Sequence, residues 1–347
     1  MAVDEMVVRV GYVVKPSRQA DFVKRGAFPE TPTENGLSFV PVMFNRPLEF
    51  QLQGVDVILH KATDEIVAVE PSGSTCPAMR VTFSEGMNEL LSYLEGHPDY
   101  CVIDPIDKIY PLLDRQMMQQ ILLELEDIST GTPCKIRAPL FLKVDTFDDP
   151  DLGEKLSDAK MCLPAIIKPQ IACGVSHAHS MAIVFKMEDF PGLPVPVPAI
   201  IQEYIDHGSF IYKFYVLGDA IFHAVRKSTP NASVLSQSSA NSGSRAIVFD
   251  SLKSLPTEEK PNADIGSSAE PSKPMLDVKL VSSAAIWMKQ RLGLTIFGFD
   301  VVVQLGTGDH VIVDVNYLPS FKEVPDDVAV PAFWKAIRSA YDSRKAK

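Results

Sequence analysis

Short apolar runs and amphipathic stretches alternate over the first hundred residues. The runs at residues 7–14, 55–60 and 101–103 are typical of buried strands. Between the second and third runs, residues 85–94 have apolar positions at helical spacing. Strands that alternate with helices usually form a parallel sheet covered by helices. We therefore predict an N-terminal parallel α/β subdomain over residues 1–108.

The middle of the chain changes to a helix followed by paired strands. Apolar residues recur at helical spacing over residues 112–125, and strand-like runs follow at 164–168 and 181–185, with a polar loop between them. Four prolines within residues 191–198 indicate a linker. We interpret residues 109–198 as a central lobe.

The last part of the chain combines strands, a long polar stretch and two helices. The predicted strands are residues 199–204, 211–217, 295–303 and 310–315, and the predicted helices are 277–292 and 332–344. The dipeptide Gly218-Asp219 separates two apolar runs and indicates a hairpin. Residues 228–274 are rich in Ser, Asn, Lys and Pro, and most of them are predicted to form a mobile surface loop. Residues 199–347 then form a C-terminal lobe, and the fold class is mixed α/β.

Composition and charge exclude several classes of protein. Hydrophobic residues make up 46% and charged residues 22% of the chain, as in ordinary globular proteins. No apolar run approaches the ~18 residues needed to cross a bilayer, so we expect no membrane insertion. The N-terminus lacks the basic start and apolar run of a secretory signal. The formal net charge of −11 disfavours nucleic-acid binding.

The five cysteines are scattered along the chain. They form no CxxC pair and suggest neither a zinc site nor a disulfide framework. We therefore expect a reduced, cytoplasmic protein, and the nucleus stays open as a second location. A monomer is the default expectation for its oligomeric state.

The most informative segment is residues 296–319, where two strands flank the turn Gly306-Thr307-Gly308. If the hairpin is centred on Thr307, Asp300 lies opposite Asp314, and Asn316 shares the face of Asp314. Facing carboxylates repel unless a cation lies between them, and oxygen donors suit a hard cation such as Mg²⁺. The alternative is that these groups are simply solvated at strand ends. Acidic residues in apolar strands are costly without partners, which favours the metal site.

Cationic side chains at several strand ends complete the pattern. They are Lys15, Arg18, Lys61, Lys168, Lys213 and Arg226, and His179 lies in the loop after the strand that ends at Lys168. Each of these residues alone is at least as often a solvated surface group. Ligands of open α/β sheets bind at the carboxyl ends of the strands, and cations inside apolar strands need anionic partners. Together with the acidic hairpin, these residues predict a phosphate-binding cleft.

Eight motifs of the chain, taken together, resemble one known family. They are HKATDEI, YPLLDR, PAIIKP, HSMAIVF, IIQEYIDH, KFYVLG, IFGFDVVV and VIVDVNYLPSF, in this order between Gly11 and Pro331. These motifs resemble the inositol 1,3,4-trisphosphate 5/6-kinases, also called inositol-tetrakisphosphate 1-kinases, which have the ATP-grasp fold. The chain looks most similar to the divergent plant type, whose members often carry an extra N-terminal region. We expect a short isoform or a trimmed chain, because the printed sequence has no such region.

The resemblance implies a role for each matching position. ATP would be bound by Arg115, Lys168, Gln202, Glu203, Tyr204, Ile205, Lys213 and Ser228. Two Mg²⁺ ions would be bound by Asp300, Asp314 and Asn316. The inositol phosphate would be bound by Lys61, His179, Lys213, Asn316 and Ser320, with Arg18 as the first basic contact and Lys15 as its alternative. Lys168 and Arg226 would act on the transferred phosphate. Ser320 stands where the family has a glycine, so substrate preference is expected to differ.

The resemblance implies in-line transfer of the γ-phosphoryl group of ATP to an inositol hydroxyl. The acceptor would be position 5 or 6 of inositol 1,3,4-trisphosphate, position 1 of inositol 3,4,5,6-tetrakisphosphate, or both. Two alternatives stay open. One is an ATP-grasp ligase that joins a carboxylate to an amine, which would need fewer cations in the first segment. The other is a protein that binds inositol phosphates without catalysis.

Overall fold

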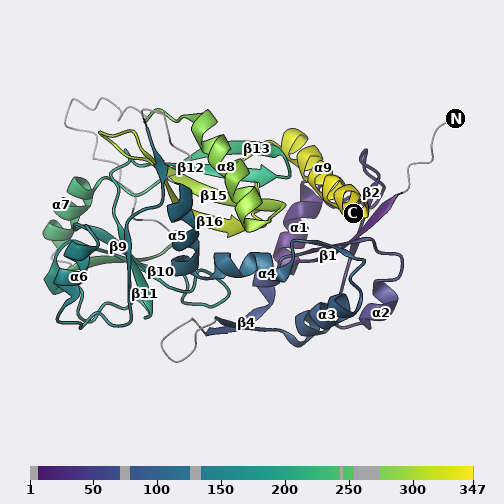
Figure 1. Cartoon of the computed structure of the whole chain (residues 1–347), viewed down its shortest axis with the longest axis horizontal. Coiled ribbons are helices and arrows are strands. Elements are labelled where there is room, and N and C mark those ends of the chain that lie inside the picture. Colours follow the sequence, from purple (N-terminus) through teal and green to yellow (C-terminus); the bar gives the residue numbers. More distant parts are fainter. Residues whose placement is uncertain are drawn as a thin grey trace.

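The computed structural model describes residues 7–70, 79–125, 134–242, 245–253, 256 and 274–346. Three larger sheets organise this part of the chain, together with one two-stranded sheet formed by β4 (Ile66–Glu70) and β5 (Arg80–Phe83). Figure 1 shows the first strands and the C-terminal helix on one side and the central strands with α6 and α7 on the other. No described helix is long and apolar enough to cross a bilayer.

The N-terminal sheet is parallel, as predicted. Its strand order is β2 (Leu37–Pro41), β1 (Val8–Val13), β3 (Val57–His60), β6 (Cys101–Ile103). The helices of this region are α1 (Pro16–Lys24), α2 (Leu48–Gln51), α3 (Glu85–Gly96) and α4 (Ile106–Ile109). The predicted strands and helix are confirmed, whereas β2, α1, α2 and α4 were not predicted.

The central sheet is antiparallel. Its strand order is β14 (Ala246–Asp250), β10 (Ser180–Val184), β9 (Ala165–Pro169), β11 (Ala199–Glu203), β8 (Phe141–Val144). Leu152 and Leu156 of α6 (Leu152–Asp158) pack in a small core with Ile167 and Ile201 of the sheet. This core is separate from the main one, so the central lobe has an apolar interior of its own.

The third sheet carries the acidic hairpin. Its strand order is β13 (Ala220–Lys227), β12 (Phe210–Leu217), β15 (Ile296–Val303), β16 (His310–Tyr317), β7 (Ile136–Arg137). Helices α8 (Val278–Leu292) and α9 (Asp326–Lys345) contribute to the same core as this sheet. That core also contains Val10 and Val57 of the N-terminal sheet, so these two sheets share one apolar interior.

Strands cross the predicted lobe boundaries. The short strand β7 belongs to the C-terminal sheet, although it lies in the predicted central lobe. Strands β11 and β14 belong to the central sheet, although they follow residue 198. The division at residues 108 and 198 stays a proposal, and these strand exchanges show how closely the two lobes interlock.

Three local predictions were wrong. The helix expected over residues 112–125 is interrupted at Asp114, where a 3₁₀ turn over Tyr110–Leu113 ends and α5 (Arg115–Leu123) begins. Asp114 caps α5 by accepting bonds from the amides of Gln116 and Met117, which favours a helix start there. The final helix begins at Asp326, six residues before the predicted start.

The third error concerns residues 228–274, which were predicted to be mostly a surface loop. The described part contains a helix, α7 (Ala232–Ser242), and the strand β14, which pairs with β10. Residues 257–273 of this stretch lie outside the described residues. The strand was missed because its partner lies about 65 residues away in the sequence, where local patterns carry no signal.

Candidate active site

A large cavity of about 1270 Å³ is lined by residues of the central and C-terminal sheets and by residues that follow strands of the N-terminal sheet. Of the seventeen residues with a role predicted from sequence, sixteen line this cavity and Ser320 does not. The sixteen are Lys15, Arg18, Lys61, Arg115, Lys168, His179, Gln202, Glu203, Tyr204, Ile205, Lys213, Arg226, Ser228, Asp300, Asp314 and Asn316. The fold thus brings together side chains that are up to 301 residues apart in the sequence, from Lys15 to Asn316.

The charge of the cavity is opposite to that of the chain. Ten lysines and arginines line it, against four aspartates and glutamates, whereas the whole chain has a net charge of −11. A concave surface with this excess of cations concentrates anions at its walls. The cavity therefore suits a ligand that carries several negative charges.

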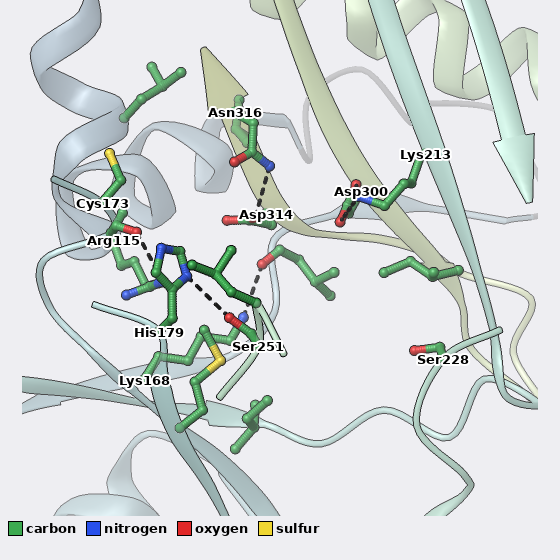
Figure 2. Close-up of a pocket in the computed structure, with 18 of the residues that line it drawn as sticks. Arg115, Lys168, Cys173, His179, Lys213, Ser228, Ser251, Asp300, Asp314 and Asn316 are labelled. Atoms are coloured by element: carbon green, nitrogen blue, oxygen red, sulfur yellow. Dashed lines mark hydrogen bonds and ion pairs between the residues drawn. The ribbon is translucent and has the colours of Figure 1, made fainter. Parts of the chain in front are cut away.

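The acidic hairpin has the predicted pair of carboxylates, although nearer the turn the ladder is one residue off a hairpin centred on Thr307. Asp300 on β15 lies opposite Asp314 on β16, and Asn316 follows on the same strand face. The amide of Asn316 donates to Asp314 at 2.9 Å, and Lys213 on β12 donates to both oxygens of Asp300 at 3.1 and 3.2 Å. Figure 2 shows these side chains around one part of the cavity.

Burial makes the Asp300 carboxylate costly without a cation. The pKa of the Asp300 carboxyl is raised, chiefly by burial and secondarily by Asp314, while Lys213 opposes the rise. Two carboxylates and an amide oxygen are the hard donors that Mg²⁺ prefers, so the donor set fits this ion. Among the described residues, no cluster of three His, Cys, Asp or Glu side chains offers a competing metal site.

Lys168 at the end of β9 connects the central sheet to this hairpin. The β15–β16 register shifts just after Asp300, and Lys168 donates from Nζ to the carbonyl oxygen of Val313 at 3.1 Å. Burial lowers the pKa of Lys168 to about 8, although Asp314 favours the charged form. The ammonium group is therefore held beside the acidic pair by a main-chain acceptor at the irregularity of the ladder.

The cations nearest the N-terminal sheet share one acidic partner. Asp64 pairs with Arg18 at 3.3 Å and with Lys15 at 3.8 Å. Lys61 donates to the carbonyl oxygen of Tyr317 and lies 5.0 Å from the centre of its ring. Burial, and after it the charge of nearby Arg18, lower the pKa of Lys61 to about 8. Asp64 was missed as a site residue, although it lies within the HKATDEI motif.

Arg226 lies at the mouth of the cavity and is 54% exposed. Glu323 accepts from Arg226 at 3.3 Å and also from the hydroxyl of Tyr215. The carbonyl oxygen of Ser320 accepts from Arg25, and Ser320 itself does not line the cavity. Lys322, two residues further on, does line it and was missed.

The predicted adenine-binding segment has its side chains engaged within the protein. Glu203 forms an ion pair with Arg137 and accepts from the amide of Leu140 at 2.7 Å. The hydroxyl of Tyr204 donates to Thr229 at 2.7 Å. With these side chains occupied, the segment offers mainly its main chain to a ligand.

Ser228 and His179 have partners that sequence reasoning missed. The ring of the buried His207 lies 2.9 Å from the hydroxyl of Ser228, and the ring of His179 lies 3.2 Å from the hydroxyl of Ser251. Ser251 follows β14, in the stretch predicted to be a loop. The ring of His179 is thus oriented by a segment that follows it by about 70 residues.

Arg115 lines the cavity, but its terminal nitrogens donate to main-chain carbonyls of the chain itself. The phosphate contact predicted for this residue has no support from the direction of these bonds.

Comparison with known proteins identifies matching families along most of the chain. A model described as the inositol 1,3,4-trisphosphate 5/6-kinase ATP-grasp domain matches residues 133–332, and one described as the pre-ATP-grasp domain matches residues 9–109. The chain is 55% identical over 336 residues to inositol-tetrakisphosphate 1-kinase 6 of Oryza sativa subsp. indica, an alignment that covers 97% of this chain and 60% of that protein. This chain therefore spans less than two thirds of that relative's own length.

More distant proteins agree with the fold. The inositol-tetrakisphosphate 1-kinase of Danio rerio is 28% identical over 325 residues, which are 92% of this chain and 76% of that protein. The D-alanine–D-alanine ligase of Bacillus anthracis, solved in complex with ATP, superimposes with a TM-score of 0.54 at 16% identity, over 98% of this chain and 99% of that chain. The second likeness shows the fold alone. The family models, the cavity and the fold lead to one conclusion: this chain belongs to the inositol 1,3,4-trisphosphate 5/6-kinase family and has the ATP-grasp fold.

Proposed function

We propose that this chain transfers the γ-phosphoryl group of ATP to a hydroxyl of an inositol polyphosphate. The observation that carries the proposal is the excess of cations around a cavity that also holds a facing pair of carboxylates. Inositol 1,3,4-trisphosphate, at position 5 or 6, and inositol 3,4,5,6-tetrakisphosphate, at position 1, are the acceptors that we propose. We expect the enzyme to act as a monomer in the cytoplasm.

In this proposal ATP lies between the central and C-terminal sheets. The main chain of residues 202–205 binds the adenine, and Ser228 contacts the nucleotide. Lys168 interacts with the phosphates, because its ammonium group lies next to the acidic hairpin and burial strengthens its interaction with an anion. Two Mg²⁺ ions would be held by Asp300, Asp314 and Asn316, and they would neutralise charge on the β- and γ-phosphates.

The inositol phosphate lies on the other side of the hairpin, toward the N-terminal sheet. Lys15, Arg18 and Lys61 contact its phosphates there, and His179 and Lys213 approach from the other two sheets. Arg226 at the mouth of the cavity neutralises charge on the group in transfer. Holding the hydroxyl and the γ-phosphate in line, and excluding water between them, supplies most of the rate.

Carboxylate–amine ligation is disfavoured for this chain. The ligase with a similar structure is related by fold alone, at 16% identity. The pre-ATP-grasp family model covers residues 9–109, which contain Lys15, Arg18 and Lys61, and all three line the cavity. These cations match a substrate with several phosphates and have no evident use for a carboxylate and an amine.

The test is incubation of the chain with ATP, Mg²⁺ and a panel of inositol tris- to hexakisphosphates, with products separated by chromatography. We expect one or more acceptors to gain a phosphate while ADP forms in equal amount. Binding of an inositol phosphate without any product would support the non-catalytic alternative and refute the proposed transfer.

Replacement of Asp314 tests the metal assignment. Asp314→Ala should reduce kcat by at least 10³-fold, because a metal clamp contributes several kcal/mol to the transition state. Asp219→Ala is the matched control, because Asp219 is 92% exposed at the β12–β13 turn of the same sheet. Activity within tenfold of wild type in the Asp314 variant would contradict the assignment.

A further inference from the structure

The loop that follows β9 forms part of the cavity wall. Residues 169–179 connect β9 to β10, and Ala172, Cys173, Gly174 and His179 line the cavity. Such a loop is useful to an anionic ligand only if it is held in one conformation, because a mobile loop must be ordered at a cost when the ligand binds.

The guanidinium group of Arg115 is surrounded by carbonyl oxygens of this loop. Nη1 donates to Pro169 at 2.6 Å and to Ile171 at 2.8 Å. Nη2 donates to Ala178 at 3.2 Å and to Ala172 at 3.4 Å. The two bonds from each terminal nitrogen use both of its hydrogens, so none of the four points at a ligand.

The remaining donor of Arg115 is not engaged by the loop carbonyls. Its Nε is buried and has no partner among the described residues. Oε1 of Gln119, one helical turn further along α5, is also buried and has no hydrogen-bond partner in the described part of the chain. Both residues line a separate cavity of about 20 Å³, the size of a single water site.

Further contacts tie the loop to the start of α5 and to β4 of the two-stranded sheet. The amide of Arg115 donates to Gln170 at 2.9 Å, and the side chain of Gln170 donates to Asp114 at 2.8 Å. Near the middle of the loop, Gly174 has a φ of +86°, and a Cβ there would lie 2.8 Å from Ile66. The loop is thus held at its ends by Arg115 and packs at its middle against the strand that begins at Ile66.

We propose that Arg115 is a positioning residue for the inositol phosphate: its guanidinium fork holds the 169–179 loop so that His179 and the loop main chain face the phosphates. This proposal rests on the proposed kinase function only for the identity of the ligand. It replaces the direct contact between Arg115 and ATP that the resemblance implies. A lysine cannot substitute, because a single ammonium group has three donors and cannot reach four carbonyls on a planar fork.

The test compares Arg115→Lys, His179→Ala and the double variant in steady-state kinetics. We expect Arg115→Lys to raise KM for the inositol phosphate about tenfold and to change KM for ATP less than twofold. In the His179→Ala background, Arg115→Lys should raise this KM by clearly less than in wild type, because part of the effect of Arg115 passes through His179 and the rest through the loop main chain. Arg291→Lys is the control, since Arg291 is 46% exposed on α8 and pairs with Glu124.

A second measurement needs neither substrate nor turnover. Hydrogen exchange of peptides covering residues 170–179 should be at least tenfold faster in Arg115→Lys than in wild type, with other peptides unchanged. Gln170→Met, which removes the bond to Asp114 but leaves Arg115 in place, should accelerate the same peptides less. This variant also keeps the question answerable if the Arg115 variant does not fold.

Three results would overturn the proposal. They are a rise in KM for ATP in Arg115→Lys, effects that multiply in the double variant, and unchanged exchange of the loop. If the wild-type chain shows no kinase activity, the proposed function fails, but the loop is still judged by exchange and by calorimetric binding of inositol hexakisphosphate. In that case, equal affinity of wild type and Arg115→Lys for this probe would refute the positioning role.

Discussion

Buried hydrogen bonds connect the N-terminal sheet to the hairpin that carries the proposed metal ligands. Asp104 follows β6 and accepts bonds at 2.9 Å from the amide of Thr295, which precedes β15. The hydroxyl of Tyr317 on β16 donates to the carbonyl oxygens of His60 and Ile103. Both Asp104 and His60 are at most 1% exposed, so their protonation is linked strongly to folding.

Burial shifts the pKa values of Asp104 and His60 in opposite directions. Burial raises the pKa of the Asp104 carboxyl from 3.8 to about 6. Burial lowers the pKa of His60 from 6.5 to about 4. Asp104 therefore stabilises the fold below pH 3.8 and loses this contribution as the pH rises through about 6. His60 stabilises the fold above pH 6.5 and loses this contribution as the pH falls through about 4.

We predict opposite pH dependences for Asp104→Asn and His60→Asn, each relative to wild type. From pH 4.5 to pH 7, the free energy of unfolding of Asp104→Asn should rise by about 2 kcal/mol relative to wild type. The reason is that the variant lacks the buried carboxyl, whose loss of a proton destabilises the folded wild type over this interval. Over the same interval, that of His60→Asn should fall by about 2 kcal/mol relative to wild type. In wild type the two contributions largely offset each other.

The assay is urea unfolding followed by far-ultraviolet circular dichroism at pH 4.5, 5.5 and 7.0. Subtracting wild type at each pH removes the contributions of all other titrating groups. The His60 variant keeps an acceptor for the amide of Ala62, which donates to the ring at 3.3 Å. Differences that stay flat with pH, or that change with the same sign in both variants, would refute the linkage reasoning.

Three further predictions concern the same region and the loop. Tyr317→Phe should lower the free energy of unfolding by about 1–3 kcal/mol in urea titrations, since the buried carbonyls of His60 and Ile103 lose the hydroxyl that they share. A smaller change would mean that water replaces the hydroxyl. Gly174→Ala should reduce kcat/KM for the inositol phosphate about tenfold or more, because the added Cβ would meet Ile66 at 2.8 Å. Gly192→Ala is the control and should leave kcat/KM unchanged, because Gly192 has a similar φ of +76° but no atom within 4 Å of an added Cβ. At saturating ATP, kcat/KM for the inositol phosphate should fall above pH 8, where Lys61 loses its charge. Lys61→Arg should move this fall to higher pH, and a pH profile identical to that of wild type would exclude Lys61 as the titrating group.

Local patterns were sufficient for much of the candidate site. The spacing of Asp300 and Asp314 around Thr307 predicted that they face each other, and the structure confirms this pair. The reason differs from the predicted one, because the ladder beside the turn pairs Val303 with His310, one residue off a hairpin centred on Thr307. An irregularity just after Asp300 shifts the register by one residue and restores the predicted pair, and the sequence pattern did not indicate it. The parallel N-terminal sheet was predictable, since alternating strand and helix patterns permit few other arrangements.

Other features depend on segments that meet only in space. Strand β14 was missed because its ladder with β10 is the reason it is extended, and that partner lies far away in the sequence. The start of α5 was misplaced because the chain at Asp114 pairs with Ile171, which breaks a helical pattern that continues through it.

For individual cations too, some features could be predicted from the sequence and others were decided only by the tertiary structure. Residue type and strand position indicated that Lys168 would lie at an anion-binding site, the family resemblance implied the same of Arg115, and both residues line the cavity. Which atoms they contact could not be read from the sequence. Lys168 donates to the carbonyl of Val313 at a shift in the ladder, and Arg115 donates to four carbonyls of one loop. A periodic pattern encodes the direction in which a side chain points, whereas its partner is set by the packing of distant segments against one another.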